Sequence, residues 1–211
     1  MYLLTCIRLD ISYAVRELAR FMSNYGRRHY DAAKHLLRYL KGTISRGIIY
    51  RDCTDLTPSF RSFCDSDWAM PERRKSVSGY IILCGGSPIS WFSKQQGIVA
   101  LSTCEAEYIS CTHCACEVIW LRSLFKELGF PQPEATLLYC DNLSTVSCTH
   151  NPHSHTHMKH IDIRAHFICN CINNRVIDIH HIAGAENPSD LLTKSLDRPT
   201  HDKWLVSLLL T

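Results

Sequence analysis

The chain has 211 residues, of which 45% are hydrophobic and 20% are charged, as in globular proteins with a substantial core. Its formal net charge of +3 is compatible with a nucleic-acid partner but too small to argue for one. It contains no run of about 18 apolar residues, the length that a membrane span needs, so we expect no membrane partner.

The N-terminus and the cysteines indicate a reducing environment. Residues 1–7 form a short apolar run that Arg8 and Asp10 interrupt at once, which does not fit a secretory signal. The twelve cysteines fall mostly in apolar periodic segments, where reduced thiols act as small core residues. We therefore expect an intracellular protein, cytoplasmic or nuclear, that is not secreted.

The first fifty residues predict a helical hairpin. Apolar side chains recur with helical spacing over residues 10–23, and a second amphipathic pattern with a basic polar face runs over 29–40. The segment 47–50 has the composition of a strand. The polar stretch 51–59 contains Pro58 and predicts a linker to a second domain.

From residue 60 onward, strand patterns alternate with helical ones. We expect strands at 61–65, 78–84, 89–93, 136–140 and 176–182, with 98–101 as a further short strand or the entry to the next element. We expect helices at 103–128, after Asn142, at 157–173 and from Ser189. Gly85-Gly86 predicts a hairpin turn between two of the strands. This order predicts an α/β fold in which helices cover the faces of a mixed sheet.

Four acidic residues stand at the ends of predicted elements. Asp65 ends the first strand, Asp141 follows a later strand, Glu107 lies in the first turns of the long helix, and Asp190 opens the last helix of the sheet domain. Ligand sites of open α/β sheets gather at the carboxyl ends of strands, so Asp65 and Asp141 converge if their strands are neighbours.

Carboxylates that converge repel one another unless cations lie between them. Two Mg²⁺ ions would relieve this repulsion and support in-line phosphoryl displacement, and oxygen ligands favour Mg²⁺ or Mn²⁺ over zinc. The alternative is four unrelated surface acids. Glu105 has a structural interpretation instead, because Ser102 and Glu105 predict a capping box at the start of the long helix.

Successive motifs resemble those of the ribonuclease H domain of copia-type LTR retrotransposons. These motifs are Asp65-Ser66-Asp67-Trp68-Ala69, residues 74–80, Ile89-Ser90-Trp91, residues 99–108, Asp141-Asn142, residues 159–163 and residues 189–194. Residues 10–15 and 37–43 resemble the end of the reverse transcriptase of the same Pol polyprotein. The resemblance covers nearly the whole chain, and the motifs occur in the family's order.

The resemblance implies a ribonuclease H-like fold, with a mixed five-stranded sheet, flanking helices and a helical hairpin before them. It divides the chain into the C-terminal remnant of a reverse transcriptase at 1–50, a linker at 51–59, a ribonuclease H-like domain at 60–196 and a helical tail at 197–211. The implied activity is Mg²⁺-dependent hydrolysis of the RNA strand of an RNA–DNA hybrid. A second implied partner is the polymerase portion of the Pol polyprotein, whose paired aspartates this sequence does not contain.

The resemblance also implies site residues. The catalytic, metal-binding residues are Asp65, Glu107, Asp141 and Asp190. Asp65 takes the first role rather than Asp67, because Asp65 stands directly at the predicted strand end. Near the last aspartate, His180 and His181 are open candidates for a catalytic histidine.

Two competing interpretations remain. The first is that the chain is a non-catalytic module that binds nucleic acid, or an inert remnant; Arg74, Lys75, Lys94 and Lys159 are the candidates for phosphate contact. A structural zinc site is the second interpretation, because Cys111 and Cys114 have CxxC spacing. Its remaining ligands would come from His150, His153, His155, His157 and His160. The position of both cysteines in the middle of a predicted helix argues against it.

Overall fold

One mixed sheet of five strands forms the centre of the protein. The computed structural model describes residues 2–50, 59–68, 74–150 and 162–208. The strands are β1 (Phe60–Asp67), β2 (Val77–Cys84), β3 (Ser87–Gln95), β4 (Thr136–Cys140) and β5 (Ile177–His181). Their order in the sheet is β3-β2-β1-β4-β5. β1, β2 and β3 pair antiparallel, whereas β1, β4 and β5 pair parallel. The predicted five-stranded α/β fold is therefore confirmed.

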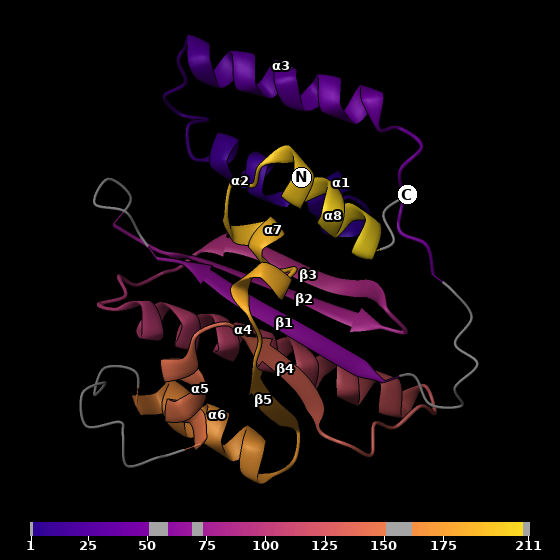
Figure 1. The fold of residues 1–211 in the computed structure, drawn as a ribbon, viewed down its shortest axis with the longest axis vertical. Coiled ribbons are helices and arrows are strands. Elements are labelled where there is room, and N and C mark those ends of the chain that lie inside the picture. Colours follow the sequence, from indigo (N-terminus) through magenta and orange to yellow (C-terminus); the bar gives the residue numbers. More distant parts are fainter. Residues whose placement is uncertain (1, 51–58, 69–73, 151–161, 209–211) are drawn as a thin grey trace.

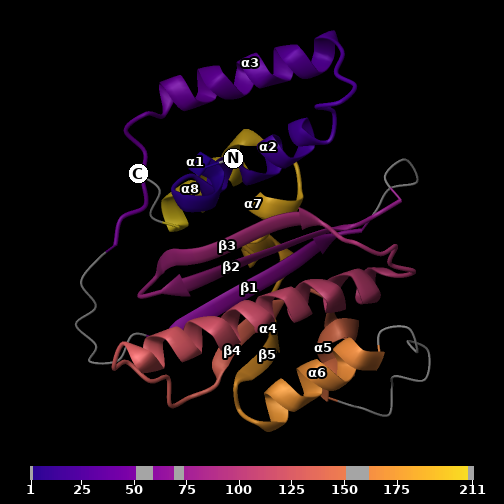
Figure 2. The same cartoon turned by 180° about the vertical axis from the view of Figure 1, so that it is seen from behind.

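Helices cover both faces of this sheet (Figure 1). One face carries α4 (Thr103–Glu127), α5 (Leu143–His150) and α6 (Asp162–Asn173). The other carries α1 (Tyr2–Cys6), the 3-10 helix η1 (Leu9–Ile11), α2 (Ser12–Ala19), α7 (Asp190–Thr193) and α8 (Arg198–Ser207). The helix α3 (Arg27–Gly42) lies beyond α2 as an outer layer, as the view from behind also shows (Figure 2). A second 3-10 helix, η4 (Gly184–Glu186), follows β5.

Two neighbouring residues of β2 show how the strand builds two cores. Ile81 and Ile82 are both fully buried, and strand alternation directs them to opposite faces of the sheet. Ile81 belongs to the core that includes Leu192 of α7 and Leu205 of α8. Ile82 belongs to the core on the α4 side. That second core contains the buried free thiols Cys64, Cys111, Cys114, Cys140 and Cys171.

The two ends of the chain meet on the α7 face of the sheet. Leu9 is fully buried and shares a core with Trp204 and Leu205 of α8. The indole nitrogen of Trp91 in β3 donates to the Leu4 carbonyl at 2.6 Å. The N-terminal helices are thereby tied both to the sheet and to the C-terminal helix.

Several predicted element ends differ from those in the structure. β1 continues two residues past Asp65, to Asp67, in antiparallel pairing with β2. The helix predicted over 10–23 is instead η1 followed by α2, which ends at Ala19. The segment 98–101 is irregular chain rather than a strand. The predicted helix start at 157–161 and most of the predicted linker, 51–58, lie outside the described residues.

The strand predicted at 47–50 is also absent. Hydrogen bonds that involve side chains, instead of continuous backbone pairing, connect this segment to the sheet. Ile48 forms only an isolated bridge. The Ser87 hydroxyl donates to the Ile49 carbonyl at 2.7 Å, and the Tyr50 hydroxyl donates to the Pro88 carbonyl at 3.1 Å.

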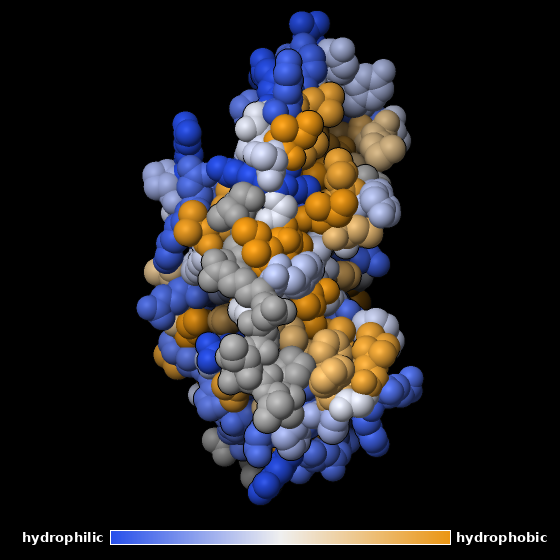
Figure 3. Space-filling model, turned by 90° about the vertical axis from the view of Figure 1, so that its right-hand side faces the viewer, coloured by the Kyte–Doolittle hydropathy of each residue, from blue (hydrophilic) through white to orange (hydrophobic). Residues whose placement is uncertain are grey.

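Apolar side chains are exposed on and beside α3. This helix buries none of its residues, and Leu37 and Ile44 are 65% and 86% exposed. Figure 3 shows apolar surface in patches over the upper half of one side of the molecule. Within the described ranges, no helix combines the length and the apolar character that crossing a membrane requires.

Candidate active site

Asp65 and Asp141 follow the last residue pair of two neighbouring parallel strands. Cys64 of β1 pairs with Cys140 of β4, and an aspartate directly follows each of these cysteines along the chain. From Asp65, which pairs with Gly79, β1 continues beside β2 only. The two carboxylates therefore meet where β1 and β4 separate, which is the position that the strand-end argument predicts.

Asp190 and Glu107 complete the group from two helices. Carboxylate oxygens of Asp65, Asp141 and Asp190 all lie within 4.8 Å of one another. Asp190 is the first residue of α7, and Glu107 lies in the second turn of α4. A carboxylate oxygen of Glu107, one of Asp141 and the Cys140 sulfur also lie within 4.8 Å of one another. The structure thus brings together all four acidic residues that the sequence singled out.

Backbone and helix-capping contacts hold Glu107 in place. Glu107 is only 4% exposed, and its Oε1 accepts a hydrogen bond from the Ser66 amide at 2.9 Å. The start of α4 is fixed by Ser102, whose hydroxyl accepts from the Glu105 amide at 3.1 Å. The Glu105 side chain in turn accepts from the Leu101 amide at 2.6 Å. The Ser102 half of the predicted capping box is therefore confirmed, whereas the Glu105 carboxylate bonds to the residue before Ser102, and Glu107 is left to face the strand ends.

Asp65 is the most buried of the four acids, at 1% exposure, and α7 supplies its side-chain partners. The Thr193 hydroxyl donates to Asp65 Oδ2. Lys194 Nζ donates to Asp65 Oδ1 at 3.1 Å and to Asp190 Oδ1 at 2.7 Å. One ammonium group therefore lies between two of the carboxylates.

A close approach between β2 and α7 makes these contacts geometrically feasible. A β-carbon at Gly79 would lie 2.7 Å from Thr193 Cγ2, closer than real contacts allow, and 3.0 Å from Leu192 Cβ, tighter than most. The absence of a side chain at Gly79 lets α7 approach β1 and β2. Asn187 fixes the loop before α7, since its Nδ2 donates to the Cys64 carbonyl at 2.9 Å.

Mutual repulsion and burial shift the pKa values of the group. Burial, together with the charge of Asp65, raises the pKa of Glu107 well above its ordinary value and also raises that of Asp141. Burial and Asp65 raise the pKa of Asp190 to about 6. Burial opposes the charge of Lys194, but Asp65 and Asp190 outweigh it and raise the pKa of the ammonium group. The cluster therefore has an excess of negative charge, and its oxygen donors fit a hard divalent cation such as Mg²⁺.

The described basic residues that were predicted to contact phosphates make no hydrogen bond to these carboxylates. Arg74 and Lys94 are exposed, and the Lys75 ammonium donates to the Gly97 carbonyl at 2.7 Å. Lys159 lies outside the described residues. Asp67 is half-buried at the last position of β1.

Within the described part of the chain, Cys111 lies with two other cysteines and not with Cys114 or His150. Among the residues described, Cys114 joins no group of three metal-ligating side chains, whereas Cys111 lies near Cys64 and Cys140. The His150 ring bonds to the Ile179 carbonyl at 3.0 Å. The remaining candidates, His153, His155, His157 and His160, fall in the part of the chain that is not described.

The two candidate catalytic histidines differ in their surroundings. His180 Nε2 lies 2.8 Å from Asp178 Oδ2 on the exposed end of β5. His181 is close enough to Asp141 for its charge to lower the pKa of that carboxyl, although burial and Asp65 outweigh it.

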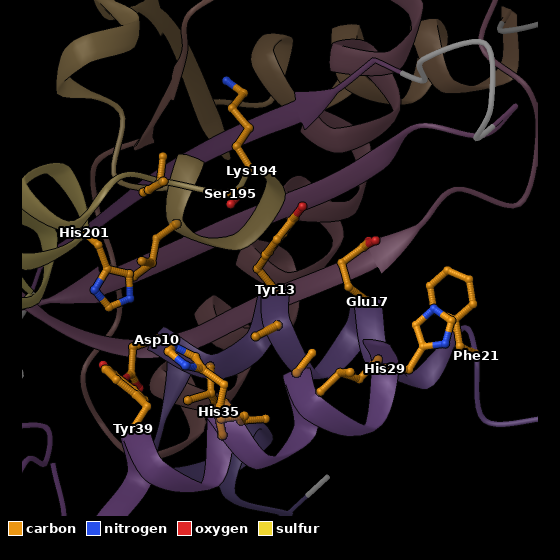
Figure 4. Close-up of a pocket in the computed structure, with 17 residues that line it drawn as sticks. Asp10, Tyr13, Glu17, Phe21, His29, His35, Tyr39, Lys194, Ser195 and His201 are labelled. Atoms are coloured by element: carbon orange, nitrogen blue, oxygen red, sulfur yellow. The ribbon is translucent and has the colours of Figure 1, made fainter. Parts of the chain in front are cut away.

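A cavity of about 540 Å³ lies beside the site, between α2, α3 and the segment that joins α7 to α8 (Figure 4). Its lining is mainly apolar, with polar groups that include Asp10, Tyr39 and His201. Lys194 also lines it, so this side chain connects the cavity to the carboxylates.

Sequence reasoning missed three residues that organise the site, namely Asn187, Thr193 and Lys194. Thr193 and Lys194 follow Asp190 by three and four residues, a spacing that places side chains on one helix face. This spacing could have indicated that Thr193 and Lys194 lie near Asp190. The Asn187-Pro188 pair reads only as a turn, and its bond to a strand 123 residues away has no local signal.

No family model matches the chain. It is 40% identical over 199 residues, 94% of its length, to the retrovirus-related Pol polyprotein from transposon TNT 1-94 of Nicotiana tabacum. It is also 40% identical over 192 residues, 90% of its length, to the Pol polyprotein from transposon RE1 of Arabidopsis thaliana. The chain spans only 15% and 13% of these two relatives. Among solved structures, LC11-RNase H1 in complex with an RNA/DNA hybrid aligns with 70% of this chain and 99% of its own, with a TM-score of 0.48 and 16% identity.

Proposed function

The chain belongs to the retrovirus-related Pol polyproteins of transposons, and on this basis we propose that it hydrolyses the RNA strand of RNA–DNA hybrids as a Mg²⁺-dependent endonuclease of the copia type. The observation that carries the proposal is the convergence of Asp65, Glu107, Asp141 and Asp190 at the point where β1 and β4 separate. Two of these acids are buried and two are half-buried. Bringing four such carboxylates together without a cation costs folding free energy, because their charges repel one another and lose solvation.

Asp65, Glu107, Asp141 and Asp190 would hold two Mg²⁺ ions, with Mn²⁺ as an alternative. When bound, the metal would supply an activated water and charge stabilisation at the leaving oxygen. The raised pKa values of Glu107, Asp141 and Asp190 support this assignment, because a bound cation is what favours the ionised form of each carboxyl.

The protein's own groups orient these acids. Thr193 and Lys194 hold the two oxygens of Asp65, and the Ser66 amide and the Cys140 thiol hold those of Glu107, so the orientation of both carboxylates is fixed by the protein. Lys194 adds a positive charge between Asp65 and Asp190, where a phosphodiester would bring further negative charge. Prior orientation of this kind lowers the cost of reaching the reactive geometry.

The partners follow from the same proposal. Arg74, Lys75, Lys94 and Lys159 would contact phosphates of the hybrid, and the polymerase portion of the Pol polyprotein would lie outside this chain. Exposed apolar residues on and beside α3, among them Leu37 and Ile44, support a missing neighbour. The free thiols of the described residues support a reducing compartment, cytoplasmic or nuclear.

A cleavage assay with labelled RNA–DNA hybrid, in Mg²⁺ and in EDTA, tests the proposal. Asp65→Asn and Asp141→Asn should each lower the cleavage rate by at least about 100-fold, as removal of one electrostatic group from an active site often does. Asp67→Asn, a half-buried acid two residues from Asp65, is the matched control and should cleave like the wild type. Hybrid binding without Mg²⁺-dependent cleavage would instead identify a binding module. Unchanged cleavage by both Asn variants would remove the site assignment.

A further inference from the structure

Three cysteines form a compact group directly behind the carboxylates. The sulfur atoms of Cys64, Cys111 and Cys140 all lie within 4.8 Å of one another, and all three residues are 0% exposed. The Cys64 and Cys111 sulfurs are 3.3 Å apart. All three are free thiols. This thiol group is a second cluster of metal-ligating side chains next to an oxygen-donor cluster.

The thiol group comes from the same three elements as three of the acids. Cys64 precedes Asp65 on β1, Cys140 precedes Asp141 on β4, and Cys111 lies one helical turn after Glu107 on α4. Strand alternation turns Cys64 toward the core on the α4 side, whereas Asp65 meets Thr193 on the α7 side. Sulfur donors thus gather beneath α4, and oxygen donors gather at the strand ends.

Glu107 connects the two clusters. Its Oε1 is held by the Ser66 amide, while its Oε2 accepts from the Cys140 thiol at 3.7 Å. A carboxylate oxygen therefore already contacts one sulfur of the thiol group. Three sulfurs and one carboxylate oxygen are a donor set that suits a soft or borderline d10 cation and not Mg²⁺.

We propose that Cys64, Cys111 and Cys140, with Glu107 as the fourth ligand, bind one thiophilic d10 cation, Zn²⁺ in the cell and Cd²⁺ as its laboratory probe. The three cysteines have no part in the proposed nuclease activity, whereas Glu107 is shared with the proposed Mg²⁺ site. It also differs from a CxxC zinc site, because Cys111 is used with cysteines of two strands and not with Cys114.

The geometry is close to what such an ion needs. A tetrahedral ion with bonds of about 2.3 Å to sulfur separates its sulfur ligands by about 3.8 Å. The observed separations between the sulfurs, from 3.3 Å to at most 4.8 Å, require adjustments of an ångström or less, and Glu107 Oε2 would move from Cys140 toward the other two sulfurs to complete the set. Binding involves no oxidation or reduction, since each sulfur that joins the ion releases its proton to solvent. Because the group is fully buried, the ion enters through local opening of the α4 contact, and binding is measured at equilibrium.

The test is a Cd²⁺ titration of the full, untagged and reduced chain. To limit binding elsewhere, Cys6, Cys53 and Cys116 are replaced by serine in every protein used. One Cd²⁺ per chain is expected, with thiolate-to-cadmium charge-transfer absorption and a ¹¹³Cd resonance typical of several sulfur ligands. The charge-transfer absorption and the sulfur-type resonance should persist in millimolar Mg²⁺, because the three sulfurs do not bind Mg²⁺.

Two variants separate this site from other cysteines. Cys111→Ala should weaken Cd²⁺ binding at least 100-fold and remove the sulfur-type resonance. Cys114→Ala, which removes an equally buried thiol three residues along the same helix, should leave both unchanged. The unsubstituted site gives a test that does not depend on a variant folding: only oxygen-type ¹¹³Cd resonances in that protein would overturn the proposal. Equal loss of the signal in both variants would overturn it too.

Discussion

Lys194 Nζ lies 3.1 Å from Asp65 Oδ1, an ion pair between residues 129 positions apart. The lysine side chain is 35% exposed and the aspartate side chain 1% exposed, so a partly solvated cation neutralises a buried anion. The same ammonium pairs with Asp190 at 2.7 Å. Without metal, Lys194 is the cation that permits the acids from β1 and α7 to lie together.

Replacing Lys194 by methionine should therefore destabilise the protein in EDTA. The change leaves Asp65 buried without its cation, and we expect the free energy of unfolding to fall by about 1–3 kcal/mol, less than for a fully buried pair because Lys194 is partly solvated. Mg²⁺ should restore more stability to the variant than to the wild type, as measured by urea unfolding with and without the ion. Lys203→Met is the control, because Lys203 donates to the Ala185 carbonyl and stacks on Trp204 instead of pairing with an acid of the site. Equal losses in the two variants would contradict this account of Lys194.

Glu107→Gln should have the opposite effect on stability. The raised pKa of Glu107, due to burial and to Asp65, means that its charge opposes folding above the ordinary pKa. An uncharged amide of the same shape still accepts from the Ser66 amide. We expect the free energy of unfolding in EDTA at pH 7 to rise by on the order of 1 kcal/mol, while the calorimetric affinity for Mg²⁺ falls. A variant that is both less stable and equally able to bind Mg²⁺ would be inconsistent with a ligand role.

Asp190 should contribute to the pH dependence of stability. Burial and Asp65 raise its pKa from 3.8 to about 6, so the folded state holds this proton more tightly than the unfolded state does. The stability of the metal-free protein should consequently fall as the pH rises from about 4 to about 6 and level off above that range. Asp190→Asn should reduce this fall by about 1 kcal/mol, after allowance for partial solvation. Urea unfolding at several pH values in EDTA gives the comparison, and identical pH profiles would disprove the expectation.

Asn187→Ala should remove the side-chain hydrogen bond that holds the loop before α7 to β1. Asn187 is fully buried, and its amide satisfies the Cys64 carbonyl at 2.9 Å. Leaving that carbonyl without a partner should cost about 1–3 kcal/mol in the free energy of unfolding. Hydrogen exchange should show faster opening of 184–194 in the variant, whereas alanine at the exposed Asn174 should change neither quantity.

The sheet was predictable because its signals are local. The Gly85-Gly86 turn has positive φ at both glycines, and apolar strands flank it, so the hairpin of β2 and β3 follows from adjacent residues. β4 has the bounds expected from its apolar run before Asp141. The length of β1 was underestimated because its last residues, up to Asp67, pair with the distant strand β2 and contact α4, and neither contact has a local signal.

The site was predictable in its acids but not in what surrounds them. Asp65 and Asp141 stand after apolar runs, and this pattern is visible along the chain. The contacts of Thr193 and Lys194 with Asp65 join residues 128 and 129 positions apart, and no periodicity records such a pairing. The thiol group depends in the same way on the packing of α4 over β1 and β4.

The close approach of α7 to Gly79 makes the position of this helix sensitive to mutation at residue 79. Every amino-acid replacement at this residue adds at least a β-carbon, and that atom would lie 2.7 Å from Thr193 and 3.0 Å from Leu192. Each missense change in this one codon should therefore force Thr193 and Leu192 of α7, the helix that carries Asp190, to shift, although residue 79 itself has no side chain to lose. In a transposon copy that is released from selection, codon 79 is a place where a single nucleotide change can separate the acids while leaving every one of them encoded.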